Sequence, residues 1–351
     1  MISFNVCESK VIMSAGITND LSTLALSCQK SCKIFIITDT NVSDIYLQHL
    51  ESQLKKLNFE VHYYIIPAGE FSKSLNTAEN IYEKLSSDLI SKNDIIISLG
   101  GGMVSDISGF VASTYKRGIK LINIPTSFLA MIDASIGGKN AVNLNSGKNL
   151  VGSFYFPDLI LIDCSFLNTL PKKELNSGIS EVIKCGAIFD KKLFNILERE
   201  KFEDNIENII YKSILVKKKL VEEDRFDSGK RMLLNFGHTI GHAIENLHGY
   251  KNISHGEAVS IGMNAITKIS EKLGLTDAGV SERLKNVCEK YCLPVENSFS
   301  IESLSEAILQ DKKIFGEYIN LVILKDIGNS FLLKLSGYNI SNFLEGREIY
   351  F

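Results

Sequence analysis

The sequence predicts a two-domain protein, with an α/β domain over residues 1–165 and an all-α domain over residues 166–351. Three observations lead to this fold class. The length, 351 residues, suits about two domains of roughly 150 residues each. Strand-like and helix-like segments alternate in the first half, whereas helical periodicity dominates the second. One strand-like segment also runs into a glycine turn, at 100–102, that opens a predicted helix.

The segments of the predicted α/β domain alternate regularly. KIFIITDT is an apolar run that ends in polar turn residues, and EVHYYIIPAGE is rich in the aromatic and β-branched residues that favour strands. Strands that alternate with helices form mostly parallel sheets covered on both faces, so we expect a Rossmann-like layer. The sequence predicts strands at 33–40, 60–70, 94–102 and 119–126, separated by helices at 42–59, 74–90 and 105–118.

The pattern changes after residues 159–163. A stretch at 167–178 that contains proline and glycine resembles a linker, and long segments with helical periodicity follow it. Only YINLVILK, at 318–325, is strand-like in the second half. We therefore expect helices at 179–189, 191–202, 205–224, 231–249 and 255–274.

Composition narrows the class of protein. Hydrophobic residues make up 45% of the chain and charged residues 23%, values typical of a globular protein with sizeable cores. The formal net charge of -3 supplies no global positive field for nucleic acid or an anionic membrane. No stretch approaches the roughly 20 apolar residues that span a bilayer, and the first residues lack the pattern of a secretory signal. The seven cysteines are an odd number in a long chain without a secretory signal, so we expect reduced thiols in a cytoplasmic protein. The net charge and the lack of a long apolar stretch predict no nucleic-acid or membrane partner.

The glycine turn, Gly100 to Gly102, indicates a phosphate site. Glycines let the backbone approach an anion closely, and the N–H groups at the start of the following helix point at it. Asp39 and Asn41, just after an earlier strand, are placed to contact a ribose or adenine, with helix capping as the alternative. The turn lacks GxGxxG spacing, so a tight structural turn explains it equally well.

The histidines indicate a metal site. His238 and His242 are one helical turn apart on one face, and His255 opens the next predicted helix. A catalytic zinc takes about three protein ligands and leaves one position open. Spacing alone favours His238 and His242 with one further group, and histidines that only pack helices are the alternative. Carboxylate candidates for the set are Glu181, Glu245 and Glu257.

Basic residues are scattered over both halves of the chain. The lysines of GGK (137–139) and SGKN (146–149) lie on glycine-containing loops, a usual setting for anion binding. Each lysine alone is explained as a solvated surface charge, and only convergence in space would change that. The candidates for a shared anionic cleft are Arg117, Lys139, Lys148, Lys184, Lys217, Arg231 and the DKK segment at 311–313.

Taken together, these motifs resemble those of the 3-dehydroquinate synthase family of sugar-phosphate cyclases. The resemblance covers nearly the whole chain and is densest in SLGGGMVSDISGFVASTYKRG, IPTSFLAMIDASIGGKNAVN, GKNLVGSFYFP, LPKKELNSGISEVIK, LLNFGHTIGHAIE and HGEAVSIGM. It implies conversion of 3-deoxy-D-arabino-heptulosonate 7-phosphate to 3-dehydroquinate and phosphate, the second step of the shikimate pathway. The implied course is transient oxidation by NAD, phosphate elimination, re-reduction, ring opening and an internal aldol step.

The resemblance also implies which residues bind the cofactors. One zinc or cobalt ion per chain is held by Glu181, His238 and His255, while His242 faces the substrate, and this set replaces the one that spacing favours. The implied NAD site consists of Asp39, Asn41, Glu70, Lys73, Gly101, Gly102, Met103, Val104, Asp106, Thr126, Ser127, Lys139, Lys148, Phe166, Thr169 and Glu174.

The remaining implied groups are mostly basic, as a substrate with a carboxylate and a phosphate requires. Two positions depart from the family pattern: Ser127 replaces a threonine but keeps the hydroxyl, and Asp227 replaces a glutamate and has a shorter arm. The implied catalytic residues are Arg117, Asp133, Lys139, Asn149, Lys184 and His242, and the implied substrate-binding residues are Lys217, Arg231, Asn235 and Lys313.

Two other functions remain as alternatives. A polyol dehydrogenase of the same architecture would also use NAD and a metal, but it would not need the basic residues. Another cyclase would act on a different sugar phosphate. A binding protein without catalysis would have no use for both a nucleotide turn and a metal site. The family is often dimeric, so we expect a homodimer.

Overall fold

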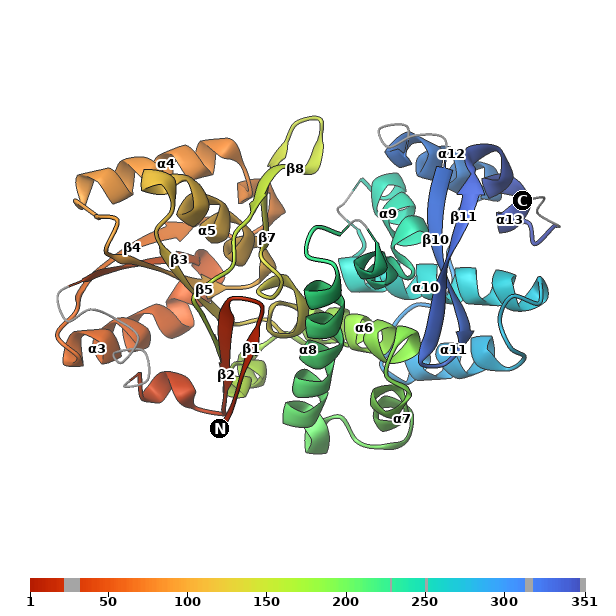
Figure 1. The fold of residues 1–351 in the computed structure, drawn as a ribbon, viewed down its shortest axis with the longest axis horizontal. Coiled ribbons are helices and arrows are strands. Elements are labelled where there is room, and N and C mark those ends of the chain that lie inside the picture. The colour runs from red at the N-terminus through yellow and green to blue at the C-terminus, as the bar shows by residue number, and fades with distance from the viewer. Residues whose placement is uncertain (22–31, 228, 250–251, 313–317, 348–351) are drawn as a thin grey trace. The chain divides into compact units, whose positions relative to one another are not determined.

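The computed structural model describes residues 1–21, 32–227, 229–249, 252–312 and 318–347. The chain forms two compact units, Met1–Pro171 and Lys172–Phe351 (Figure 1). The division follows residue 171, whereas the sequence places the boundary after residue 165. No described helix combines the length and the apolar character needed to cross a membrane.

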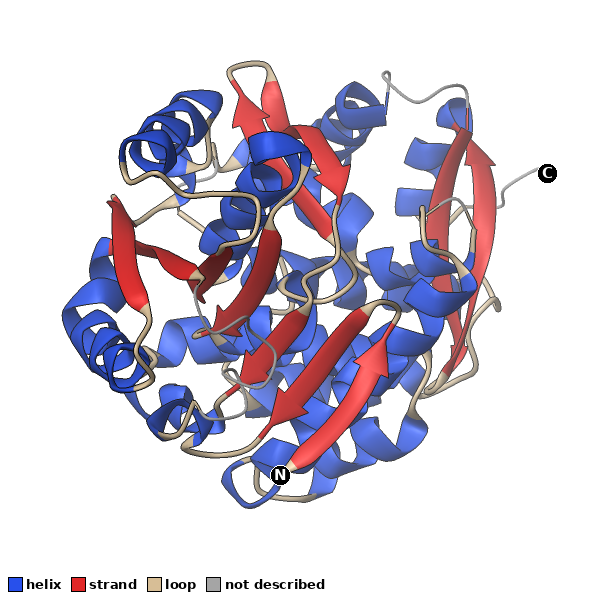
Figure 2. Cartoon of the chain, turned by 60° about the vertical axis from the view of Figure 1, so that its left-hand side comes forward, coloured by secondary structure: helices blue, strands red, loops and turns tan. Residues whose placement is uncertain are grey.

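The first unit is built on a seven-stranded sheet with the order β1-β2-β9-β6-β5-β3-β4. β1 runs antiparallel to β2, and the other neighbouring pairs are parallel. Figure 2 shows these strands as adjacent arrows. Their bounds are β1 (Ile2–Val6), β2 (Ser9–Met13), β3 (Lys33–Asp39), β4 (Glu60–Ile66), β5 (Ile95–Gly100), β6 (Lys120–Pro125) and β9 (Leu159–Ile162).

Helices cover both faces of this sheet, which confirms the predicted α/β class. α4 and α5 lie on one face and α3 on the other (Figure 1). β5 is buried at every position, and β3 at every position after Lys33, which explains why both strands are continuous apolar runs instead of alternating ones. The bounds are α2 (Thr40–Val42), α3 (Gln48–Lys56), α4 (Leu75–Ser87) and α5 (Gly102–Thr114), and a π-helical turn, Ser43–Leu47, joins α2 to α3.

A second sheet in the first unit is not indicated by the sequence. β7 (Lys139–Leu144) pairs antiparallel with β8 (Gly147–Phe154) and packs on α5. These stretches carry the GGK and SGKN loops, and β8 has no buried position, so they lack a strand-like apolar pattern. Close packing depends on Gly109 of α5, where an added Cβ would lie 1.7 Å from Oδ1 of Asn140.

The second unit is mostly helical, as expected, but it also contains a β-hairpin. β10 (Tyr318–Asp326) matches the strand-like YINLVILK, and it pairs antiparallel with β11 (Asn329–Ser336). The expectation of only helices is corrected here, because a strand needs a partner for its backbone N–H and C=O groups. The helices are α6 (Lys172–Ile188), α7 (Lys191–Arg199), α8 (Ile206–Glu223), α9 (His238–Leu247), α10 (His255–Lys272), α11 (Val280–Lys290), α12 (Ile301–Lys312) and α13 (Ile340–Leu344).

α6 is buried along most of its length. Every residue from Ser177 to Ile188 is buried, and the helix contacts α7, α8 and α10. Two charged side chains, Glu181 and Lys184, lie in this buried stretch, each only 2% exposed. Burying a charge costs free energy unless the charge is paired or binds an ion, so these two side chains indicate a functional site.

Candidate active site

Three predicted metal ligands converge in the second unit. Oε1 of Glu181 lies 3.7 Å from Nε2 of His238 and 3.7 Å from Nε2 of His255. One ligand atom from each residue lies within 4.8 Å of the other two. Glu181 comes from the middle of α6, whereas the two histidines are the first residues of α9 and α10. Glu181, which precedes both histidines by more than 50 residues in the sequence, is thus brought to the same point as they are.

Glycines let the three helices approach closely enough for this convergence. A Cβ on Gly262 of α10 would lie 2.0 Å from the carbonyl oxygen of Gly237, the residue before His238. A Cβ on Gly256 would lie 2.3 Å from the carbonyl oxygen of Ser177 on α6. Both distances are far below contact, so any side chain at these positions would push α10 away from α9 or α6. This close backbone packing therefore sets the positions of the helix starts at which His238 and His255 lie.

The donor set suits a divalent ion such as zinc. Oε1 of Glu181 is buried and accepts no hydrogen bond from any described residue. The other oxygen, Oε2, accepts a hydrogen bond from Nζ of Lys184. Tetrahedral ligands at about 2.1 Å from zinc lie roughly 3.4 Å from one another, close to the 3.7 Å separations here. One carboxylate oxygen and two imidazole nitrogens therefore form a three-ligand site.

The protonation of His238 is compatible with a metal ligand. Its Nδ1 lies 3.1 Å from the carbonyl oxygen of Phe236 and donates to it, which leaves Nε2 to face Glu181. Burial lowers the pKa of His238 well below its usual value, and the nearby positive charge of Lys184 adds to this effect. The ring is therefore neutral, as metal coordination requires.

His255 has a different electrostatic environment. Burial lowers its pKa, but a hydrogen bond with Glu245 and the negative charges of Glu181 and Glu245 outweigh that effect and raise it. His242 lies on the same side of α9, with its ring centroid 5.5 Å from that of His238. His242 belongs to a second group of potential ligands, with Glu245 and His255, and not to the group around Glu181.

Two buried basic side chains of the second unit come from elements that contact α6. Lys217 on α8 and Arg231 in the turn Lys230–Asn235 are buried, at 6% and 3% exposure, and α6, α8 and this turn contact one another. Nη1 of Arg231 donates to the carbonyl oxygen of Arg225 at 2.9 Å, which orients the guanidinium. Asn235 is exposed in the same turn, and Glu174 is exposed in the first turn of α6. Lys313 lies outside the described residues.

Several predicted nucleotide residues of the first unit lie where the parallel strands end, at the carboxyl edge of its sheet. The parallel strands follow the order β4-β3-β5-β6-β9-β2. β4 and β5 lie on opposite sides of β3, so the strand order reverses between β3 and β5. Ligands of open α/β sheets bind outside the strand ends at such a reversal. β3 ends at Asp39, β5 ends at Gly100, and Thr126 donates its backbone N–H to the carbonyl oxygen of Gly100 at 3.0 Å.

The glycine turn at this edge has no room for larger residues. A Cβ on Gly101 would lie 3.3 Å from Oγ of Ser127, and one on Gly100 would lie 2.6 Å from Val104. α5 begins at Gly102, so its free N–H groups face the edge, together with Met103 and Val104 in the first turn. Asp39 caps α2, because its Oδ1 accepts hydrogen bonds from the backbone of Asn41 and Val42. The capping alternative for Asp39 is thus realised.

A buried lysine joins several predicted residues beside the hairpin β7–β8. Nζ of Lys73 donates to Oδ2 of Asp106 and to Oδ1 of Asn149. Asn143 donates from Nδ2 to Oε1 of Glu70 at 2.8 Å and accepts from the backbone N–H of Asn149 at 2.9 Å. Glu70, Lys73, Asp106 and Asn149 therefore form one connected network.

The other predicted residues of the first unit are more exposed. Lys139 begins β7, Lys148 lies on β8, and both are exposed, while Asp133 is half-buried in a π-helical turn. Arg117 is exposed, and both it and Lys116 have positive φ angles, 62° and 48°. Strained backbone of this kind is more often found at functional positions than elsewhere.

Tyr46 contacts predicted cofactor residues, although the sequence does not single it out. Its ring centroid lies 4.5 Å from that of Phe166, and its hydroxyl hydrogen-bonds to Thr169, so it contacts two of the predicted cofactor residues. Phe166 and Thr169 lie in the turn Cys164–Thr169, more than 100 residues away in the sequence. No local pattern distinguishes Tyr46 from the other residues of its predicted helix.

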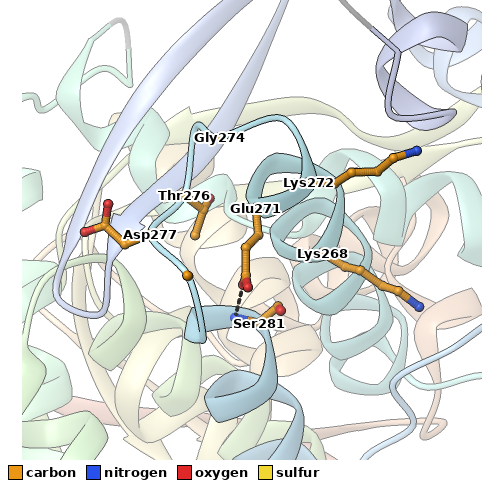
Figure 3. A pocket seen from close by; sticks show the side chains of 8 residues that line it. Lys268, Glu271, Lys272, Gly274, Thr276, Asp277 and Ser281 are labelled. Atoms are coloured by element: carbon orange, nitrogen blue, oxygen red, sulfur yellow. Dashed lines mark hydrogen bonds between the residues drawn. The ribbon is translucent and has the colours of Figure 1, made fainter.

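A surface pocket at the other end of α10 contains none of the predicted residues. Figure 3 shows its lining and the hydrogen bond that Glu271 accepts from the backbone of Ser281. Glu271 also accepts a hydrogen bond from the backbone of Gly279 and so caps α11. His255 begins α10, whereas the pocket lies against its last turns. The residues that line it are Lys268, Glu271, Lys272, Gly274, Thr276, Asp277, Ala278 and Ser281.

Known proteins with this architecture include sugar-phosphate cyclases. A structure of 2-deoxy-scyllo-inosose synthase with carbaglucose-6-phosphate, NAD+ and Co2+ superposes with a TM-score of 0.86, at 24% identity, over 99% of this chain and all of that one. A structure of 2-epi-5-epi-valiolone synthase from Streptomyces hygroscopicus with NAD+ and Zn2+ also gives 0.86, at 24% identity, over 98% of this chain and 96% of that one. These likenesses establish the fold.

Sequence comparison identifies the family. Residues 63–177 match the family model of the 3-dehydroquinate synthase N-terminal domain, and residues 178–314 match that of the C-terminal domain. A 3-dehydroquinate synthase from Clostridium acetobutylicum is 47% identical over 339 residues, which cover 95% of each chain. Because both halves match and the identity extends over nearly the full length, the chain belongs to the 3-dehydroquinate synthase family.

Proposed function

We propose that the chain is a 3-dehydroquinate synthase, a carbon–oxygen lyase of the shikimate pathway. It converts 3-deoxy-D-arabino-heptulosonate 7-phosphate to 3-dehydroquinate and inorganic phosphate. The observation that carries the proposal is the convergence of Glu181, His238 and His255 in a chain of this family. We further propose that the enzyme is a cytoplasmic homodimer.

The proposed cofactors are NAD and one zinc or cobalt ion per chain. Solved structures with this fold contain NAD+ together with Co2+ or Zn2+. When bound, NAD supplies a reversible hydride acceptor and the metal supplies a Lewis acid, so the overall reaction has no net redox change. Glu181, His238 and His255 would hold the metal through Oε1 and the two Nε2 atoms.

Lys184 has two proposed roles beside this site. Its ammonium holds Oε2 of Glu181, which leaves Oε1 directed at the two histidines. With His242, it is also placed to handle the proton of the substrate hydroxyl at carbon 5. Loss of the hydroxyl proton and of a hydride from carbon 5, for which bound NAD would be the acceptor, would leave a ketone. That ketone would acidify the proton at carbon 6. Phosphate can then leave by elimination, and the substrate phosphate itself can accept the proton.

The buried cations of the second unit suit the two anionic groups of the substrate. Arg231 has a planar guanidinium whose orientation is set by Arg225, a geometry that favours bidentate contacts with carboxylate or phosphate. Lys217 supplies a compact charge, and its burial strengthens any contact with an anion. Asn235 and Lys313 complete the proposed substrate site.

The first unit supplies all of the proposed NAD contacts except Glu174, which lies on α6. The reversal of strand order at β3 and β5, the glycine turn and the free N–H groups of α5 support a nucleotide at this edge. Arg117, Asp133, Lys139 and Asn149 are proposed as further catalytic groups. The proposed NAD contacts are Asp39, Asn41, Glu70, Lys73, Gly101, Gly102, Met103, Val104, Asp106, Thr126, Ser127, Lys139, Lys148, Phe166, Thr169 and Glu174.

One assay tests the function. The protein is incubated with the heptulosonate phosphate, zinc and NAD at a catalytic amount. We expect one phosphate released per substrate, formation of 3-dehydroquinate, and no accumulation of NADH. NADH formed from glycerol, with no phosphate release, would instead identify a polyol dehydrogenase. Turnover of glucose 6-phosphate but not of the heptulosonate phosphate would identify a different cyclase.

A further inference from the structure

His255 lies between two carboxylates that come from two different helices. Its Nε2 is 3.7 Å from Oε1 of Glu181 on α6. Its Nδ1 is 3.4 Å from Oε2 of Glu245 on α9. Glu245 is only 7% exposed, and a carboxylate buried to that degree needs a partner. Each ring nitrogen of His255 thus faces a different acidic group.

We propose that Glu245 is a positioning residue for His255 and, through it, for the metal site. The proposal rests on the proposed function, because it takes His255 as a metal ligand. Glu245 accepts the Nδ1 proton, which fixes the ring tautomer and directs the Nε2 lone pair toward the site of Glu181 and His238. A histidine ligand whose second nitrogen is held by a carboxylate binds metal more tightly, because its orientation is fixed and its basicity rises.

The other histidine of the site is held in a matching way. Nδ1 of His238 faces the carbonyl oxygen of Phe236 at 3.1 Å, and Nε2 faces Glu181. Both imidazoles therefore have Nδ1 engaged by an acceptor and Nε2 directed at the same carboxylate oxygen. The acceptor is a neutral carbonyl for His238 but a carboxylate for His255. Glu245 thus adds a negative charge next to the ligand shell without entering it.

The alternative role for Glu245 is that of a direct metal ligand, since it forms a second group of potential ligands with His242 and His255. The structure favours the positioning role for two reasons. The buried oxygen that lacks a hydrogen bond belongs to Glu181 and not to Glu245. The imidazole nitrogen that faces Glu245 is Nδ1, whereas Nε2 of both His238 and His255 faces Glu181. A metal held by both Nε2 atoms lies on the Glu181 side.

The test measures metal affinity in the full chain without NAD or substrate. The dissociation constant for Zn2+ is determined by competition with a chromophoric chelator, and Co2+ is used to record the visible d–d spectrum. We expect Glu245→Ala to weaken Zn2+ binding by about 10- to 100-fold while one ion still binds per chain. The cobalt spectrum should also change. Glu245→Gln keeps an oxygen acceptor for the Nδ1 proton, so it should recover part of the lost affinity.

A matched control is Glu271→Gln, since Glu271 lies on α10 with His255 but its carboxylate caps α11 instead. We expect wild-type metal affinity from this variant. Wild-type affinity and an unchanged cobalt spectrum in Glu245→Ala would overturn the proposal. Complete loss of the ion from Glu245→Ala would also overturn it, because it would make Glu245 a ligand. If the alanine variant does not fold, Glu245→Asp replaces it: its shorter arm should weaken binding, and wild-type affinity would overturn the proposal.

Failure of this inference is distinguishable from failure of the proposed function. Glu181→Ala removes a proposed ligand and should abolish tight Zn2+ binding. If Glu181→Ala binds Zn2+ like the wild type, the metal site of the proposed function is wrong. If Glu181→Ala loses the ion but Glu245→Ala does not lose affinity, only the positioning role of Glu245 is wrong.

Discussion

The two oxygens of Glu181 have different surroundings, and this difference defines the site at the residue scale. Oε2 is held by Lys184, whereas Oε1 is buried, accepts no hydrogen bond from a described residue and faces two imidazoles. A buried carboxylate oxygen without a partner costs free energy that a bound cation would recover. The pairing with Lys184 therefore stabilises Glu181 without occupying the oxygen that faces the histidines.

His255→Ala should lose metal and activity together. The substitution removes one of three ligands, and two remaining ligands hold a divalent ion much more weakly. The measurement is zinc content after gel filtration, alongside phosphate release from the substrate. His248→Ala is the control, since the His248 ring packs against Phe299, at a centroid distance of 5.0 Å, and is outside the ligand group. Full zinc content in His255→Ala would show that the ligand assignment is wrong.

Arg231→Ala should weaken substrate binding and leave NAD binding nearly intact. A hydrogen bond to a charged group contributes roughly 1.5–3 kcal/mol, so we expect the KM for the heptulosonate phosphate to rise about 10- to 100-fold. The dissociation constant for NAD, measured by fluorescence, should stay within about twofold. Arg199→Ala serves as the control, because the Arg199 side chain is exposed and contacts only Glu198 among the ion pairs observed in the described residues. An equal loss of substrate and NAD binding would contradict the role of Arg231.

At the scale of elements, the packing of α10 on α9 and α6 decides where the ligands lie. Gly262 lies against the backbone of Gly237, and Gly256 lies against that of Ser177. These contacts are backbone to backbone, so side-chain repacking cannot relieve an added methyl group. The start of α10 is further held by a capping box, in which Ser254 and Glu257 bond each other's backbone N–H groups.

Gly262→Ala tests this packing. The new Cβ would lie 2.0 Å from the carbonyl oxygen of Gly237, so α9 and α10 must separate. We expect a loss of about 1–3 kcal/mol in the free energy of unfolding and a weaker affinity for Zn2+. Urea unfolding and chelator competition provide the two measurements, with Lys268→Ala on the same helix as the control. Unchanged metal affinity in a folded Gly262→Ala protein would show that the ligand geometry does not depend on this contact.

In the first unit, Asp163 ties together the segments that follow β9 and β2. It is fully buried, and its carboxylate accepts hydrogen bonds from the backbone of Gly16, Thr18 and Ser165 and from the hydroxyls of Thr18 and Ser165. Burial on its own raises the pKa of Asp163. The hydrogen bonds more than offset this effect and lower the pKa below its ordinary value.

This lowered pKa predicts how stability depends on pH. The ionised carboxylate stabilises the fold fully above the unfolded pKa of about 3.9, and this contribution is lost as the pH falls through the lower folded pKa. Asp163→Asn should therefore cost on the order of 2 kcal/mol at pH 7, and the difference from the wild type should shrink below about pH 4. Urea unfolding at several pH values measures this difference in the free energy of unfolding. Asp44→Asn, at an exposed position, is the control. A difference that does not change with pH would contradict this account.

At the scale of the whole molecule, ligand binding should stabilise the unit that contains the ligand site. An ion that binds only the folded chain adds about 2.7 kcal/mol when its free concentration is 100 times the dissociation constant. We therefore expect zinc to raise the melting temperature of a transition that a chelator lowers again, in scanning calorimetry. His255→Ala should show no such shift. An equal shift in that variant would mean that zinc binds elsewhere.

Much of the fold follows from local patterns in the sequence. Apolar runs and amphipathic stretches of the first unit predict its strands and helices, because a sheet covered on both faces requires buried strands between covering helices. The hairpin β7–β8 is missed, since its exposed strands carry glycine and lysine instead of an apolar pattern. β11 is missed for a related reason: it has few buried positions, and its pairing with β10 depends on a chain reversal at Ile327–Gly328.

The candidate site, like the fold, is predicted from the sequence only in part. Residue types and spacing by themselves indicate a nucleotide turn at Gly100–Gly102 and a metal-binding pair at His238 and His242, and the motifs indicate a family. Which imidazoles share a carboxylate is decided only by tertiary structure, where His238 and His255 face Glu181 and His242 does not belong to that group. The physical reason is the distance along the sequence over which a pattern carries information. Helical periodicity relates residues three or four apart. The contacts between α6, α9 and α10 are backbone contacts at Gly237, Gly256 and Gly262, and no local pattern encodes them.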